Sequence, residues 1–116
     1  MRRVVIESPY AAPVGTWAPL RWWFRLRNRR YARACMRSSL RIGEAPIASH
    51  LLYTQPGVLS DARPAERCLG IDAGLAWGIK ADAVAVYTDL GISPGMQAGI
   101  YAAHAAKIPV EYRRLW

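Results

Sequence analysis

Short apolar runs alternate with longer stretches of helical spacing along the chain. The apolar runs predict four strands, at residues 3–8, 45–49, 82–88 and 108–112. Helical spacing predicts three helices, at residues 28–42, 61–79 and 94–106. Strands joined in turn by helices need right-handed crossovers, which give a parallel sheet. Residues 83–87 are apolar at every position, as expected for a central strand covered on both faces. The pattern therefore predicts an α/β fold.

The predicted strand order is 2-1-3-4, in a flavodoxin-like three-layer sandwich with helices on both faces. All 116 residues form a single domain. In such a sheet the order reverses between the first and third strands, and ligands bind outside the carboxyl ends of the strands there. This rule gathers residues from three connections at one edge: Tyr10, His50, Tyr53, Asp89, Ser93 and Gly95.

The turn after the third strand has the features of an anion site. Ser93 is a good N-cap residue, and Pro94 has the φ angle suited to the first helical position. The first N–H groups of a helix have no partner within it and lie at the positive end of its dipole. Ser93, Gly95 and Met96 are therefore candidates for binding a phosphate, a carboxylate or a ribose hydroxyl. An ordinary strand-to-helix turn is the alternative.

Positive charge is concentrated in the first third of the chain. The formal net charge is +8, and fourteen arginines outnumber two lysines. Nine of the arginines precede Leu40, where Glu7 is the only acid. This asymmetry predicts a surface for nucleic acid, a phosphorylated small molecule or an anionic partner. Arginine forms forked contacts with phosphate, although a GC-rich genome would produce the same bias.

Four motifs, in their order and spacing, resemble one known family. They are Ser8-Pro9-Tyr10, residues 46–55, Glu66-Arg67-x-x-Gly70-Ile71 and Asp89-x-Gly91-x-Ser93-x-Gly95-Met96. Together they resemble the small phage and bacterial members of the nucleoside 2-deoxyribosyltransferase-like superfamily, over nearly the whole chain except residues 11–27. The resemblance implies a flavodoxin-like fold and a pocket for a nucleoside or nucleotide. It also implies chemistry at the N-glycosidic bond, as deoxyribose transfer or as hydrolysis of deoxynucleoside monophosphates.

The roles that the resemblance implies fall on several residues of this chain. Ser93 and the amides after it match the helix start that holds a phosphate or sugar hydroxyl. Asp89 matches a substrate-contacting aspartate, and Tyr10 matches the residue that follows the first strand. The family's glutamate nucleophile, however, would fall at Gly99. A glycosyl-enzyme intermediate needs a carboxylate, and no acid lies between Asp89 and Glu111.

Three outcomes are open. Asp89, Glu7 or Asp72 could supply the carboxylate from another element. His50 or Asp89 could act as a base that activates water, although a lone histidine is more often structural. The protein could instead bind a nucleotide without reacting, as a sensor, a sponge for a signalling nucleotide or a regulatory subunit. The third outcome is favoured, because the predicted fold and anion site remain while the reactive group is absent.

Residues 11–27 are predicted to be an inserted connection, far longer than the usual length of about 2–6 residues. They contain Trp17, Trp22 and Trp23 among arginines. A contact between subunits is the first expectation, because Trp and Arg anchor interfaces. A lid over the pocket is the second, and a nucleic-acid platform is the third. This platform underlies the alternative function, a basic nucleic-acid-binding module. An interfacial membrane contact is a fourth possibility.

The sequence also allows predictions about cofactors, cysteines, membrane spans and assembly. No His, Cys and carboxylate cluster has ligand spacing, so neither a metal nor another cofactor is predicted. Cys35 and Cys68 are predicted to be buried thiols. No apolar run reaches the roughly 18 residues that span a bilayer, and no signal-peptide core is present. We expect a cytoplasmic homodimer or larger homo-oligomer, with exposed tryptophans that include Trp116.

Overall fold

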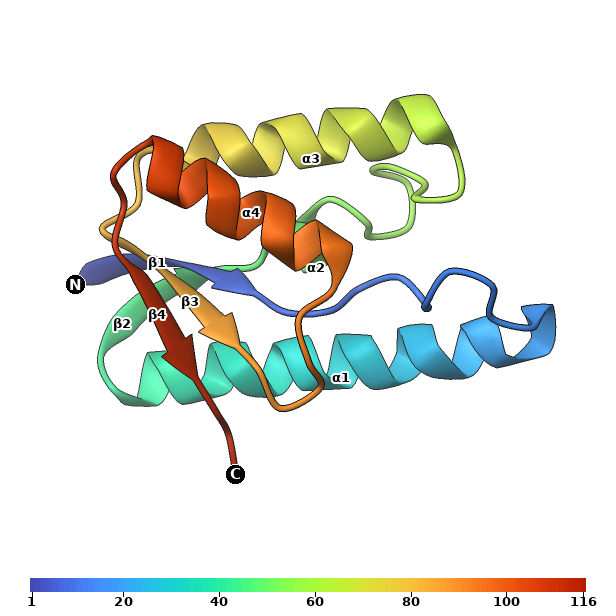
Figure 1. The fold of residues 1–116 in the computed structure, drawn as a ribbon, viewed down its shortest axis with the longest axis horizontal. Helices are drawn as coiled ribbons and strands as arrows, with labels where there is room; N and C mark the ends of the chain where they lie inside the picture. The colour runs from blue at the N-terminus through green and yellow to red at the C-terminus, as the bar shows by residue number, and fades with distance from the viewer.

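The sheet has the predicted topology. The computed structural model describes residues 1–116, with four parallel strands in the order β2-β1-β3-β4 (Figure 1). The strands are β1 (Arg2–Glu7), β2 (Glu44–Ile47), β3 (Ala83–Tyr87) and β4 (Val110–Arg113). The helices are α1 (Ala18–Arg41), α2 (Ser49–Leu52), α3 (Pro64–Gly78) and α4 (Pro94–Ala105). The predicted α/β, flavodoxin-like fold and its strand order are confirmed.

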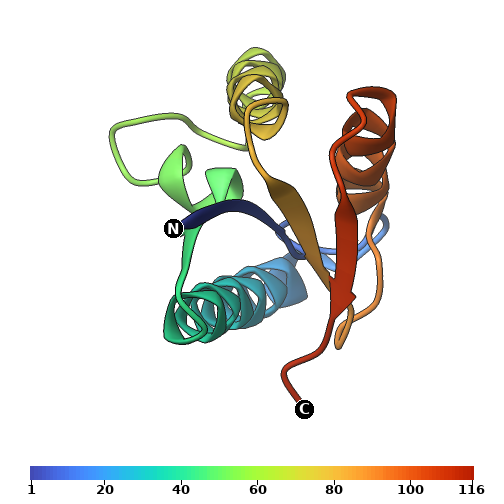
Figure 2. The same ribbon diagram turned by 90° about the vertical axis from the view of Figure 1, so that its left-hand side faces the viewer.

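Helices cover both faces of the sheet. α1 lies on one face, and α3 and α4 lie on the other (Figures 1 and 2). In the register of the sheet, Val5 of β1 aligns with Ile47 on one side and Val84 on the other. Every residue of β3 is buried, as expected for an inner strand with covered faces. The carboxyl ends of β1 and β3 therefore lie together at the edge where the ligand crevice is predicted.

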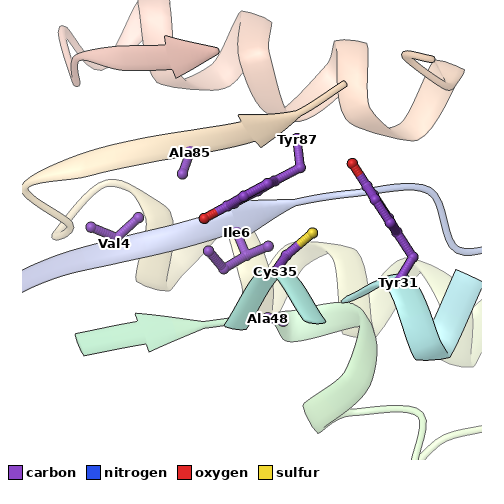
Figure 3. Packing of buried hydrophobic residues seen from close by; sticks show 7 residues of the cluster. All are labelled: Val4, Ile6, Tyr31, Cys35, Ala48, Ala85 and Tyr87. Atoms are coloured by element: carbon purple, nitrogen blue, oxygen red, sulfur yellow. The ribbon is translucent and has the colours of Figure 1, made fainter. Parts of the chain in front are cut away.

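The face beneath α1 is closed by a tightly buried core (Figure 3). Its buried members are Val4, Ile6, Tyr31, Cys35, Ala48, Ala85 and Tyr87. Tyr31 and Cys35 come from α1, Ala48 lies between β2 and α2, and the others come from β1 and β3. Full burial of a large apolar side chain contributes roughly 1.5–3 kcal/mol. This cluster therefore fixes α1 to the sheet.

An ion pair also spans this face of the sheet. The guanidinium of Arg113 in β4 donates to both carboxylate oxygens of Glu44 in β2, each at 2.7 Å. These two strands are the opposite edges of the sheet. The Arg113 guanidinium lies 6.0 Å from the centre of the Tyr87 ring. Hydrogen bonds from Arg113 and Ser39 lower the pKa of Glu44 to about 2, so this carboxyl is ionised at neutral pH.

The opposite face is less completely filled. Val5, Val84 and Val86 of the sheet pack against Met96 and Ala103 of α4. α3 contributes no buried residue and lies mainly against α2 and α4. A cavity therefore separates much of α3 from the strands.

α1 begins at Ala18, and the prediction of a connecting segment up to residue 27 is wrong. After Pro19 the segment contains no glycine or proline and is rich in arginine and leucine, which favour helix. The extra turns show no apolar stripe, because this end of α1 projects beyond the sheet (Figure 1). Asn28 is buried within the helix and donates its amide to the carbonyls of Tyr10 and Ala11. None of the helices is both long and apolar enough to cross a membrane.

The other element boundaries lie close to the predicted ones. Ser93 caps α4, as predicted. Gly43, with a φ of 86°, follows the end of α1. α3 begins at Pro64, slightly later than expected. Cys35 is buried as predicted, but Cys68 is exposed, because α3 does not pack into the core.

Candidate functional site

A large cavity lies between α3, α4 and the carboxyl end of β1. Its volume is about 640 Å³, which is within the usual range for small-molecule sites. Val5 and Val84 line it from the sheet. Gly70, Gly74 and Gly78 line it from one side of α3, together with Ile71 and Leu75. A Cβ at Gly74 would lie 2.6 Å from the Ser49 hydroxyl oxygen, so this glycine lets α2 approach α3 closely beside the cavity.

Six of the seven predicted site residues line this one cavity. They are Tyr10, His50, Tyr53, Ser93, Gly95 and Met96. His50 lies on α2 and Tyr53 follows its end, in a short helix that the sequence pattern does not predict. Residues 11–14 line the cavity, whereas the tryptophans of residues 11–27, considered as a possible lid, do not.

Asp89 is the predicted residue that the structure places elsewhere. Its side chain is fully buried and accepts a 2.6 Å hydrogen bond from the hydroxyl of Tyr31. The backbone N–H groups of Leu115 and Trp116 also donate to this carboxylate, at 2.9 and 3.4 Å. Burial acts to raise the pKa of Asp89, but these donors lower it below its usual value. Asp89 therefore anchors the carboxyl-terminal residues and does not face the cavity, which corrects its expected role.

The start of α4 is capped by its own residues. The Ser93 hydroxyl accepts a hydrogen bond from the Met96 N–H at 3.3 Å, and the Ser93 N–H lies 3.4 Å from the Met96 sulfur. The Met96 side chain is buried in the core, so it shapes the cavity wall. The N–H of Gly95 makes no backbone hydrogen bond. Gly95 therefore keeps a free donor in the first turn of α4, as an anion site requires.

Ser8 and His50 form a polar pair in the cavity. The Ser8 Oγ lies 2.7 Å from His50 Nε2, and the edge of the Tyr10 ring meets the His50 ring with centroids 6.1 Å apart. Burial lowers the pKa of His50 to about 4, so the imidazole is neutral at pH 7. A neutral imidazole can accept a proton from a hydroxyl group or from water.

The carboxyl group of Glu7 lies against Gly99 of α4. A Cβ atom placed on Gly99 would lie 2.6 Å from Cδ of Glu7 and 3.0 Å from one carboxyl oxygen. Burial raises the pKa of Glu7 to about 7, and no hydrogen bond or cation opposes this shift. Of the three acids considered from the sequence, Glu7 lines the cavity, whereas Asp72 and Asp89 do not.

Ser8 lines the cavity, although the sequence did not identify it as a site residue. Its position was the available signal, because it directly follows β1 at the same edge of the sheet as His50. Nowhere in residues 1–116 do three His, Cys, Asp or Glu side chains gather closely enough to hold a metal ion.

Comparison with known protein families gives one match. The model of a domain of unknown function, DUF7768, matches residues 2–113, which include all of β1 to β4. No curated protein matches the chain in sequence. Since the match covers nearly all of the chain, this protein belongs to the DUF7768 family.

Proposed function

We propose that the cavity binds a nucleoside or nucleotide, and that Glu7 supplies the carboxylate for a reaction at its N-glycosidic bond. The contact between Glu7 and Gly99 carries this proposal. The sequence resembles nucleoside 2-deoxyribosyltransferase-like proteins, whose glutamate would fall at Gly99. Glu7 fills that space from a different element, so a carboxyl group is present although α4 contains none.

The lining of the cavity suits the parts of such a ligand. The free N–H of Gly95 and the hydroxyl of Ser93 suit a phosphate or a sugar hydroxyl. The rings of Tyr10 and Tyr53 can pack against a base. The net charge of +8 favours an anionic ligand such as a nucleoside monophosphate.

In the proposed reaction the ionised carboxylate of Glu7 attacks the anomeric carbon of the sugar. The bond from this carbon to the base nitrogen breaks, and the base leaves with the electron pair and takes up a proton from the solvent. Water then attacks the glycosyl ester and frees both the sugar and Glu7, while one proton of the water passes to neutral His50, which releases it to the solvent. A second base in place of water would give transfer. With a pKa of about 7, roughly half of Glu7 is ionised at neutral pH.

The test measures binding and turnover separately. Deoxynucleosides and their monophosphates are incubated with the protein, free base is measured by chromatography, and binding is measured by thermal shift. We expect wild-type protein to release base. Glu7→Gln should bind the same ligand and release base at least about a hundredfold more slowly, because the nucleophile is lost.

Two further variants sharpen this test. Asp72→Asn removes an acid outside the cavity and should behave as wild type. Glu7→Ala/Gly99→Asp returns a carboxylate to the same space from α4 and should recover part of the activity of Glu7→Ala. If the protein binds a ligand but releases no base, Glu7 has no catalytic role, and the protein acts as a sensor or a sponge for that ligand. A panel with neither binding nor release would contradict the whole proposal.

A further inference from the structure

The amino-terminal end of α1 extends beyond the sheet (Figure 1), and tryptophans at this end are exposed. Trp17, Trp22 and Trp23 are 70%, 68% and 49% exposed. Trp23 packs edge-on against Phe24 at 5.0 Å, and the Arg27 guanidinium lies over both rings. Trp22 has no aromatic or cationic partner of this kind, so its ring is available to another molecule.

The arginines of α1 form no salt bridges. The helix contains eight arginines and no Asp or Glu. None of the eight takes part in an ion pair. The arginines that do are Arg2, Arg3, Arg63, Arg67, Arg113 and Arg114, all of which lie outside α1. A concentrated positive surface without internal neutralisation attracts polyanions and releases their counterions when they bind.

Three of these arginines share a surface hollow with Trp22. The hollow has a volume of about 290 Å³ and is lined by Ala18, Arg21, Trp22, Arg25 and Arg29. Their spacing places them on one side of the helix. The Nε atom of Arg25 is buried and makes no hydrogen bond. A buried donor without a partner is costly, so an anionic ligand that accepts from Arg25 would remove this cost.

We propose that this side of α1 binds single-stranded nucleic acid. The Trp22 ring stacks on a base, and Arg21, Arg25 and Arg29 bind neighbouring phosphates. A strand alternates flat bases with phosphates, and this surface alternates an indole with guanidinium groups. A membrane-binding helix instead separates its apolar face from its charged face, whereas Trp22 lies within the row of arginines. A duplex hides the faces of its bases, so a single strand fits better.

This binding surface is independent of the cavity. The residues that line the hollow on α1 are all different from those that line the cavity beside Glu7. Nucleic-acid binding therefore does not depend on the proposed nucleotide function, and each can fail without the other. A mononucleotide that fills the cavity should leave oligonucleotide binding unchanged.

The test is fluorescence anisotropy of labelled single-stranded DNA and RNA oligonucleotides, titrated with the full chain over a series of salt concentrations. With about three phosphates neutralised, the logarithm of the association constant should fall with the logarithm of salt at a slope of about −2. Arg21→Gln/Arg25→Gln/Arg29→Gln should weaken binding at least about tenfold and flatten this slope. Trp22→Ala should weaken binding about tenfold at every salt concentration and leave the slope unchanged.

The matched control removes three charges from another side of the same helix. Arg30→Gln/Arg37→Gln/Arg41→Gln should weaken binding far less than the first triple variant, and circular dichroism should show both variants folded. An equal loss in the two variants would overturn the proposal, because charge alone would then explain binding. Absent or salt-insensitive binding would overturn it, and so would binding to anionic phospholipid vesicles without binding to oligonucleotides.

Discussion

Glu7, at the end of β1, holds its carboxyl group in the space where a side chain at Gly99 of α4 would begin. The Cδ atom of Glu7 lies 2.6 Å from the Cβ position of Gly99, closer than two unbonded carbon atoms can approach. The two positions therefore exclude each other, and glycine at 99 is the condition for Glu7 to face the cavity. A carboxyl group can reach this point from the strand or from the helix, but not from both.

This exclusion predicts that Gly99→Ala destabilises the protein. Alanine favours helix over glycine by up to about 1 kcal/mol, but the new methyl group must displace the buried Glu7 carboxyl. We expect a net loss of about 1–2 kcal/mol in the free energy of unfolding, measured with urea. Gly78→Ala is the control, because a Cβ at Gly78 would meet no atom within 4 Å. Equal effects of the two substitutions would contradict the close contact with Glu7.

The raised pKa of Glu7 predicts a dependence of stability on pH. The pKa of Glu7 is about 7 in the folded protein, against 4.5 for an unperturbed glutamate. Between these pH values the folded state holds more protons than the unfolded state, so the contribution of Glu7 to stability falls as pH rises. Glu7→Gln cannot ionise. Its free energy of unfolding relative to wild type should therefore increase by at most about 3 kcal/mol from pH 4.5 to pH 7. Above pH 7 this difference should stay constant.

The measurement is urea unfolding of both proteins at several pH values. The comparison removes the contribution of His50, whose lowered pKa acts in the opposite direction. His50 binds a proton more readily when unfolded, so its own contribution to stability rises between pH 4 and pH 6.5. A difference between wild type and Glu7→Gln that does not vary with pH would show that Glu7 is not buried as described.

Asp89→Asn separates an anchoring role from a catalytic one. The substitution weakens the bonds to Tyr31, Leu115 and Trp116, and we expect a loss of about 1–3 kcal/mol in stability. Hydrogen exchange of the carboxyl-terminal peptide should accelerate, while the affinity for any cavity ligand stays unchanged. Tyr31→Phe, which removes one of the same bonds, should show a milder form of this effect. If Asp89→Asn instead lost ligand binding, Asp89 would have to be counted among the ligand-binding residues.

The strands and their order were predictable because a strand that is buried on both faces needs apolar residues at every position. β3 is apolar at each position, and Ser93 with Pro94 marks the start of α4. The first turns of α1 were not predictable by the same means. They project beyond the sheet and pack against no core, so they carry no apolar stripe. Tertiary packing, which reveals most helices through their periodicity, does not act on this segment.

The site was predictable only in part, for a related reason. The switch in strand order brought Tyr10, His50 and Ser93 to one edge of the sheet. That rule places residues near an edge but does not orient their side chains. Asp89 stands beside this edge, yet it turns to the hydroxyl of Tyr31. The contact between Glu7 and Gly99 joins distant parts of the chain, and no local pattern records it.

The ion pair between Glu44 and Arg113 predicts the largest single loss of stability. Arg113→Met removes the two 2.7 Å bonds to a carboxylate whose side chain is only 7% exposed. Glu44 then keeps only Arg2, at 3.3 Å, and the hydroxyl of Ser39 as polar partners. Because a buried charge that loses its main partner is costly, we expect a loss of about 3 kcal/mol in the free energy of unfolding. Arg114→Met is the control, because Arg114 is 70% exposed and should contribute less than about 1 kcal/mol.

The pKa of Glu44 gives this last prediction a second readout. In wild type it is about 2, so stability should fall as pH decreases from 4.5 toward 2, where the folded carboxylate takes up its proton. Without Arg113 the pKa of Glu44 should move upward, and acid should then destabilise the variant less steeply than wild type. Glu44→Gln/Arg113→Met, which removes both charges, should recover part of the loss. A double variant as unstable as the sum of the single ones would show that the two side chains do not act as a pair.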